Sequence, residues 1–452
     1  MPRREYGHDH HDEDERTSLL VQQRDDSRVR EEGEERRSWR KLEVLVCWLV
    51  AWFATFNFTV VLPGLRPYLD DIHTEKADLV YGIITGVCPL ATAFGALLIP
   101  QIVSRWQPRL GPFMALLVAF SLPMFAYGFV RNPWAILVLR TLGGFTASTA
   151  VFCRKALAQG SPQAITFNMT GFTVCMGIGY ASGPAVGAAL ATVHGIHDYI
   201  LVGIVCGSGA LLLCILSLII FFRTPTAHQQ PQQPQHQRQG GPPTTTPVES
   251  STPLLPTRTP FSRQLIYLYL INALITIVFT AFVAAAAPRI GDIFDWHDTK
   301  AGYVQAVIGA AFALSGLTNG ILLEHVPFHA NFAIAFACSA GGSALLADWT
   351  AGGSPNLPRV IVGCLLSGFG NSLTGTMVMK RIGMVTRNNP NMKTRAFSWL
   401  TITVGLASIF ASVWTGVMLH YHVGVDLYYA NLGLVAVSTL ASVAVDKHPV
   451  DL

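Results

Sequence analysis

The chain has 452 residues, of which 51% are hydrophobic and only 13% are charged, and its formal net charge is +4. Soluble domains carry about 25% charged residues, so this composition argues against an ordinary soluble enzyme. The charges are also unevenly placed, because residues 1–41 hold ten Lys or Arg and twelve Asp or Glu. No basic stretch is typical of a nucleic-acid-binding arm. We therefore expect residues 1–41 to be a disordered cytosolic tail ahead of a very apolar body.

Twelve long apolar runs follow this tail, and most of them contain no charge. A helix that crosses a lipid bilayer needs ~20 mostly apolar residues. Backbone polar groups in lipid must be satisfied within the segment, which favours helices, and short alternating segments are absent. The sequence predicts an all-α membrane protein with twelve transmembrane helices. The runs are 42–63, 79–99, 112–130, 134–153, 165–191, 199–222, 265–287, 301–323, 329–347, 358–379, 396–419 and 425–445.

A polar segment divides the body into two halves of six runs each. Residues 224–262 are rich in Gln, Pro and Thr, which predicts a disordered linker. The expected units are an N-terminal bundle, 42–223, a C-terminal bundle, 263–446, and a short tail, 447–452. Motifs recur between the halves at a nearly constant offset of 223 to 225, which indicates two pseudo-symmetric six-helix bundles with a site between them. The pairs are Gly86 and Gly309, Gly144-Phe145 and Gly368-Phe369, Thr55 and Thr280, and Pro63 and Pro288.

The short loops predict the orientation in the bilayer. Lys and Arg are more frequent in the loops that share a side with the termini, which favours cytosolic termini. The opposite loops carry a set of acidic residues that includes Asp70, Asp71 and Asp292, so we expect a negatively charged outer face.

Arg140 lies about seven residues inside the fourth run, roughly 10 Å along a helix. A charge at that depth is costly and should face the bundle interior, where Gly144 on the same face allows close helix approach. No run contains a well-buried Asp or Glu, so an unpaired cation favours an anionic substrate. The alternative is that Arg140 binds backbone carbonyls and only braces the helices.

Other polar residues within apolar runs are candidates for the translocation path. Asn57 and Thr59 lie in the first run, and Asn272 and Thr276 lie in the seventh. In duplicated carriers, spans 1, 4 and 7 line the cavity. Hydrogen bonding between helices is the competing interpretation.

The fifth run carries a stripe of small residues spaced four apart: Gly171, Cys175, Gly179, Gly183 and Gly187. This spacing predicts close helix packing. Pro184 removes a backbone donor and should bend the helix into a rocking element.

The N-terminal tail contains a candidate sorting signal. Glu15 precedes Leu19 and Leu20 by four and five residues, the form that sorting adaptors read for delivery to endosomes and lysosomes. The sequence lacks the common hydrolase, P-loop and zinc motifs, and no Cys–His pattern suggests a metal site. We expect no enzyme activity, no cofactor and no metal.

Two motifs give the chain a resemblance to the major facilitator superfamily. Arg140 and Gly144 match the RxxxG pattern of span 4, and Gly179 to Gly187 match GxxxGPxxG of span 5. The loop after span 2 is degenerate, although Arg105 and Arg109 remain as the residues that would connect the cytosolic helix ends in gating.

Within that superfamily the chain most resembles the lysosomal ceroid-lipofuscinosis branch, on segments 67–69, 104–112 and 151–154. This resemblance implies an endolysosomal membrane and anion conductance, with chloride as the leading candidate. We therefore predict an endolysosomal transporter of a small solute or ion, in the lipid bilayer, with the plasma membrane as the alternative location. The alternatives in function are a proton-coupled exporter of organic compounds and a non-transporting scaffold or sensor.

Overall fold

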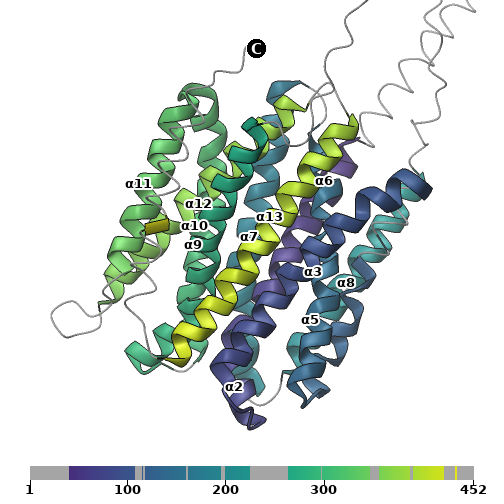
Figure 1. The fold of residues 1–452 in the computed structure, drawn as a ribbon. Helices are drawn as coiled ribbons and strands as arrows, with labels where there is room; N and C mark the ends of the chain where they lie inside the picture. The colour runs from purple at the N-terminus through teal and green to yellow at the C-terminus, as the bar shows by residue number, and fades with distance from the viewer. Residues whose placement is uncertain are drawn as a thin grey trace, which may run out of the picture.

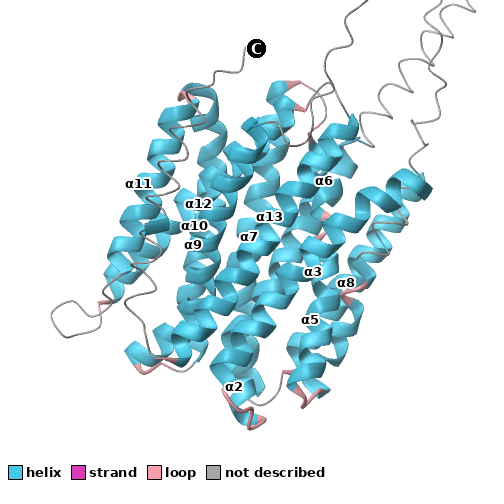
Figure 2. Cartoon of the chain, viewed as in Figure 1, coloured by secondary structure: helices cyan, strands magenta, loops and turns pink. Residues whose placement is uncertain are grey.

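The computed structural model describes residues 40–106, 115, 118–158, 161–194, 199–223, 263–296, 298–346, 356–386, 390–421 and 433–434. Within these ranges the chain is helical and has no strand (Figures 1 and 2). Ten helices are long and apolar enough to cross a membrane, and each coincides with a predicted run. Of the other two runs, 112–130 is described at 115 and 118–130, where it ends in the 3₁₀ helix over Leu122–Phe129 and is not among the ten, and 425–445 lies outside the described residues except for 433–434. The predicted all-α membrane class is confirmed for the described part of the chain.

The N-terminal half begins with a helix over residues 40–59, which turns at residues 60–61 and continues as α2 (Leu62–Asp71). The further elements are α3 (Ala77–Trp106), the 3₁₀ helix η1 (Leu122–Phe129), α5 (Pro133–Ala147), α6 (Ala150–Leu157), α7 (Pro162–His194) and α8 (Ile200–Arg223). The start of α5 follows from its sequence, because the Asn132 side chain accepts a hydrogen bond from Trp134 N and Pro133 needs no donor. Residues 148–149 form a turn, so the predicted fourth span is two stacked helices, α5 and α6.

The C-terminal half comprises α9 (Arg263–Phe294), α10 (Asp298–His325), α11 (Phe328–Leu346), α12 (Leu357–Val385) and α13 (Pro390–His420). In Figure 1 α9, α10, α11 and α12 lie on the left of the molecule, α13 crosses its centre, and α3, α5 and α8 lie on the right. The predicted tail, 1–41, lies outside the described residues except for residues 40 and 41, and the linker 224–262 and the C-terminal tail 447–452 lie wholly outside them.

The predicted repeat corresponds to equivalent packing in the two halves. Gly144 of α5 lies against the Cys88 carbonyl of α3, where a Cβ atom would collide. Gly368 of α12 lies in the same way against the Ile308 carbonyl of α10, at 2.8 Å from an ideal Cβ position. Fourth-span helices therefore pack on second-span helices through matched glycines in both halves.

The two halves meet along two pairs of helices that are in contact over much of their length, α7 with α10 and α3 with α13. Glycine backbone forms the closest approaches in both pairs. Gly309 of α10 faces the α7 backbone at Ala181, and Gly82 of α3 faces Gly416 of α13. Side chains at these positions would hold the helices apart.

The small-residue stripe of α7 faces the first helix rather than the C-terminal half. A Cβ atom at Gly179 would collide with Thr55 Oγ1, at Gly183 with Thr59 Oγ1, and at Gly187 with the Val60 carbonyl. Pro184 lies inside α7 and cannot donate to the Tyr180 carbonyl.

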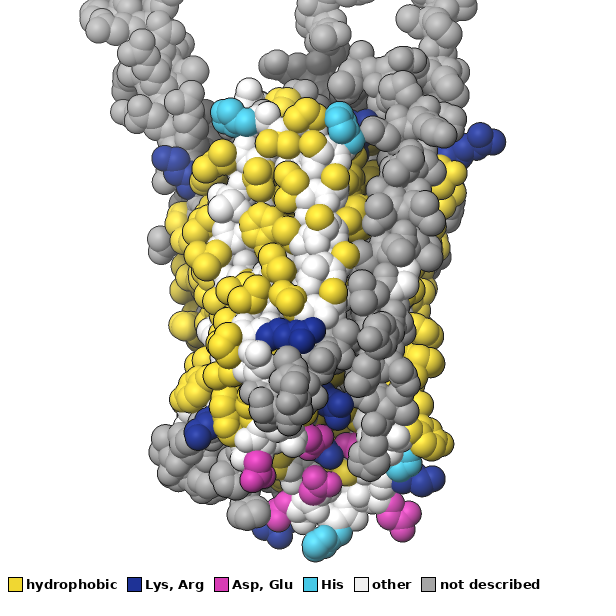
Figure 3. All heavy atoms as spheres, turned by 90° about the vertical axis from the view of Figure 1, so that its left-hand side faces the viewer, with side chains coloured by type: hydrophobic (Ala, Val, Ile, Leu, Met, Phe, Trp, Pro, Cys, Tyr) yellow, Lys and Arg dark blue, Asp and Glu magenta, His cyan; other side chains and the backbone are white. Residues whose placement is uncertain are grey.

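One end of the helix bundle carries acidic side chains, which gather at the lower end of the molecule in Figure 3 below a broad band of hydrophobic side chains. We call it the acidic end. Arg66 there forms ion pairs with Asp78 at 2.8 Å and with Asp292 at 3.1 Å. Asp292 belongs to α9, so this second ion pair connects the two halves.

Candidate functional site

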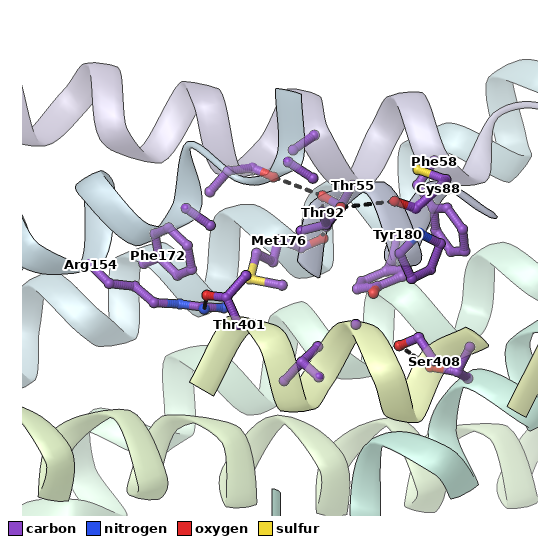
Figure 4. Close-up of a pocket in the computed structure, with 18 residues that line it drawn as sticks. Thr55, Phe58, Cys88, Thr92, Arg154, Phe172, Met176, Tyr180, Thr401 and Ser408 are labelled. Carbon is purple, nitrogen blue, oxygen red and sulfur yellow. Dashed lines mark hydrogen bonds between the residues drawn. The ribbon is translucent and has the colours of Figure 1, made fainter. Parts of the chain in front are cut away.

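A central cavity lies between the two halves, with an empty volume of about 740 Å³ that includes space open to solvent (Figure 4). Several lining helices contribute residues at helical spacing along one face, such as Thr401, Val404, Gly405 and Ser408 on α13. The repeat-related pair Thr55 and Thr280 both line it, one from each half. The other lining residues are Ala51, Ala54, Phe58, Cys88, Pro89, Thr92, Ala147, Ala150, Arg154, Phe172, Met176 and Tyr180.

Arg154 of α6 is the charged residue of this lining. Its exposed fraction is 7%. The Nη1 atom donates a hydrogen bond to Thr401 Oγ1 of α13 at 2.9 Å, which joins the two halves. The guanidinium carbon lies 5.4 Å from the centre of the Phe172 ring. Its Nε atom is buried and has no hydrogen-bond partner among the described residues.

No Asp or Glu is among the described residues that line the cavity. A buried cation normally needs a counter-charge or several hydrogen bonds to offset its desolvation. Arg154 has one bond to a neutral hydroxyl and one ring contact. The cavity therefore presents a concentrated positive potential that an anion entering it would neutralise.

The far part of the cavity is apolar and aromatic. Phe172, Met176 and Tyr180 follow one face of α7, so the cavity extends roughly 12 Å from the level of Phe172 to that of Tyr180. Figure 4 shows Arg154 and Phe172 at one end, and Phe58, Cys88 and Tyr180 at the other. Behind Tyr180 lie the rings of Phe279 and Phe312, at centroid distances of 5.4 and 5.6 Å.

Arg140, the residue that the sequence singled out, lies behind this lining. Its exposed fraction is 1%, and it donates to the carbonyls of Asn57 and Phe58, both at 2.9 Å. These carbonyls lie in the last turn of the helix over residues 40–59, where the negative end of the helix dipole favours a cation. The Phe58 ring lines the cavity, and its centroid is 5.5 Å from the Arg140 guanidinium carbon.

The other predicted path residues also lie outside the described lining. Asn57 Nδ2 donates to Ser121 Oγ at 3.2 Å, and Thr59 donates to the Thr55 carbonyl at 2.9 Å. Asn272 is buried, with 7% of its surface exposed, and its carbonyl accepts a hydrogen bond from Thr276 at 2.6 Å. The structure therefore brings Asn57 together with Arg140 and places Asn272 and Thr276 apart from them.

The remaining predicted residues lie at helix contacts, in α3 or outside the described residues. Gly144, Gly179, Gly183 and Gly187 lie at helix contacts, as described above. Arg105 belongs to α3, and Arg109 lies outside the described residues. The sorting signal of Glu15, Leu19 and Leu20 also lies outside them. Within the described part of the chain, no group of three His, Cys, Asp or Glu is placed to hold a metal.

Sequence reasoning did not select Arg154, although it is the charged residue of the cavity. It follows the fourth apolar run directly, where hydropathy alone assigns a charged residue to a loop. Two signals could have found it. Arg154 lies on one helical face with the small residues Ala147 and Ala150, and it ends the segment 151–154 that carried the family resemblance.

Comparison with known proteins agrees with this architecture. A family model described as Major Facilitator Superfamily matches residues 47–412. The gallate transporter of Pseudomonas putida is 24% identical over 442 residues, covering 91% of this chain and 92% of that protein. Major facilitator superfamily domain-containing protein 8 of Xenopus laevis is 26% identical over 192 residues, covering 40% of this chain and 36% of that protein.

Solved structures share the fold at lower sequence identity. The crystal structure of the human organic anion transporter MFSD10 (TETRAN) is 16% identical, with a TM-score of 0.61, and covers 89% of this chain and 99% of its own. An inward-facing, occupied structure of a bacterial homologue of the human lysosomal transporter Spinster is 13% identical, with a TM-score of 0.63, covering 90% and 97%.

Proposed function

We propose that this chain, which belongs to the Major Facilitator Superfamily, transports a small organic anion whose negative group binds Arg154. The observation that carries the proposal is the buried Arg154 guanidinium, which faces a central cavity with no carboxylate among its described lining residues. The cation belongs to the N-terminal half and its hydrogen-bond partner, Thr401, to the C-terminal half. The cavity is lined from both halves, so a bound substrate would contact both, as alternating access around a central site requires.

The cavity favours an organic anion over the chloride ion that the family resemblance suggested. A chloride ion needs several donors to replace its hydration, and Arg154 is the charged donor among the described lining residues. The rest of the lining is rich in Ala, Phe and Met, which an organic body would cover. Two matched proteins, the gallate transporter and the organic anion transporter MFSD10, are named for organic anions.

Proton coupling through a cavity carboxylate has no support among the described lining residues. We therefore propose transport that follows the anion gradient, by uniport or by exchange of one anion for another, rather than proton-coupled export. A scaffold without transport would have no use for a buried cation facing a cavity of this size.

We also propose an endolysosomal membrane as the site of action. The support is the Glu15–Leu20 signal in the sequence, together with the fold shared with a homologue of a lysosomal transporter. Removal of Leu19 and Leu20 by alanine substitution should move the full-length protein to the plasma membrane in a fluorescence localisation assay. Unchanged localisation would refute a role for this signal.

The transport proposal is tested by uptake into liposomes that contain the purified full-length protein. The probes are labelled lactate, succinate, benzoate and chloride, each with and without a pH gradient. We expect uptake of at least one organic anion, loss of that uptake in Arg154→Gln, and normal uptake in Arg131→Gln, which removes an exposed cation outside the cavity. Chloride flux without uptake of any organic anion would show that chloride is the substrate. Full activity of Arg154→Gln would refute the role of Arg154.

A further inference from the structure

We infer that the cavity selects an aromatic monocarboxylate, with its carboxylate at Arg154 and its ring between Met176 and Tyr180. This inference rests on the proposed organic-anion transport and narrows it to a substrate class. Three features of the lining carry it: the number of cations, the hydrogen bonds that the hydroxyl groups already make, and the position of the aromatic side chains.

The number of cations limits the substrate to one negative group. Arg154 is the charged residue among the described lining residues. Arg140 is close, but its two Nη atoms donate to the carbonyls of Asn57 and Phe58, and the Phe58 ring lies on its cavity side. A second carboxylate would therefore have to enter the cavity without a cation to pair with, at a large desolvation cost.

Three threonines of the lining have already committed their hydroxyl protons to backbone carbonyls. Thr92 donates to the Gly144 carbonyl at 2.8 Å, and Thr401 donates to the Phe397 carbonyl at 2.9 Å. Thr55 donates to backbone carbonyls of its own helix and of α7.

The remaining threonine and serine of the lining form a pair. Thr280 and Ser408 bond to each other at 3.2 Å across the two helices α9 and α13. One hydroxyl of this pair donates and the other keeps its proton, and Tyr180 also carries a hydroxyl, so the lining offers neutral donors but no second positive charge. The lining therefore admits one anionic group, at Arg154, and offers little to a second one.

The aromatic side chains determine the body of the substrate. Beyond Arg154 the lining offers Met176 sulfur, the Phe58 ring and the Tyr180 ring, all suited to the face or edge of another ring. Tyr180 is held by Phe279 and Phe312 of the opposite half, so it is positioned before a substrate arrives. The roughly 12 Å between the levels of Phe172 and Tyr180 accommodates a carboxylate and one ring joined by a short spacer.

Binding to the full-length protein in lipid nanodiscs tests this inference with four matched probes. They are 3-phenylpropionate, hexanoate, which has no ring, 3-phenylpropanol, which has no charge, and 3-(4-carboxyphenyl)propionate, which has two charges. We expect 3-phenylpropionate to bind at least about tenfold more tightly than each of the others, from the burial and ring contacts of its aromatic part.

Two variants of Tyr180 assign the preference to this end of the cavity. Tyr180→Leu should weaken 3-phenylpropionate binding about tenfold and leave hexanoate binding unchanged, whereas Tyr180→Phe should bind both as the wild type does. Equal binding of hexanoate, or of the dianion, would overturn the inference while leaving organic-anion transport in place. Absence of Arg154-dependent binding for every carboxylate would overturn both proposals.

Discussion

Replacing Arg140 by methionine separates the structural arginine from the one that faces the cavity. The change keeps an unbranched apolar stem, which is shorter than that of arginine, and removes the donors to the Asn57 and Phe58 carbonyls, both of which are 2.9 Å away. Hydrogen bonds from a charged donor contribute about 1.5–3 kcal/mol each in soluble proteins, whereas polar contacts within membranes average ~0.6 kcal/mol. For two buried bonds that stabilise the end of a helix, we expect a loss of about 3 kcal/mol.

The assay is thermal unfolding of the purified protein in detergent, followed by intrinsic fluorescence. A loss of about 3 kcal/mol lowers Tm by roughly 6–12 °C for a unit the size of one half. Arg154→Met should stay within a few degrees of the wild type, because it removes one hydrogen bond to Thr401 and relieves the burial of a charge. The reasoning is refuted if Arg140→Met unfolds at the wild-type temperature and has lost organic-anion binding, since Arg140 would then be the anion site.

Two further predictions concern helix packing and the acidic end. Gly183→Ala should lower Tm, because its Cβ would collide with Thr59 Oγ1 at a typical cost of about 1–3 kcal/mol. Adding Thr59→Ala should restore most of the lost stability, and no rescue would mean that the clash lies elsewhere. Arg66→Gln removes a partly exposed ion pair to Asp292, worth about 1 kcal/mol at most. This variant should therefore change the ratio of open to closed states at the acidic end by up to about fivefold, as measured by the distance between spin labels on α2 and α9. An unchanged distance distribution would contradict this prediction.

The helical fold was predictable because lipid leaves a spanning chain few alternatives. Run length alone located the ten described membrane helices, and the constant offset between Thr55 and Thr280 indicated the duplication. The same offset identified two residues that line the cavity, although neither was selected as a site residue.

The site could not be predicted in the same way, because hydropathy gives the depth of a residue in the membrane and not the direction in which its side chain points. Arg140 attracted attention through its position deep in an apolar run, yet its side chain caps the carbonyls of a neighbouring helix. Arg154 was passed over because it ends an apolar run, yet the turn at residues 148–149 and the helix α6 place it in the cavity. Only the arrangement of helices distinguishes an arginine that supports the backbone from one that faces the empty volume.

The glycine contacts between the halves have a consequence for the speed of conformational exchange. Where Gly82 meets Gly416 and Gly309 meets the backbone at Ala181, the surfaces are smooth, without side chains inserted into the opposite helix. Interdigitated side chains must unpack before two helices can move, which adds an enthalpic barrier, whereas smooth backbone surfaces can roll on each other while staying in contact. The activation energy of the transport cycle should then arise away from these glycine contacts. Its sources would be the polar contacts between the halves, such as Arg66 with Asp292 and Arg154 with Thr401, and the packing of the Tyr180 ring against Phe279 and Phe312.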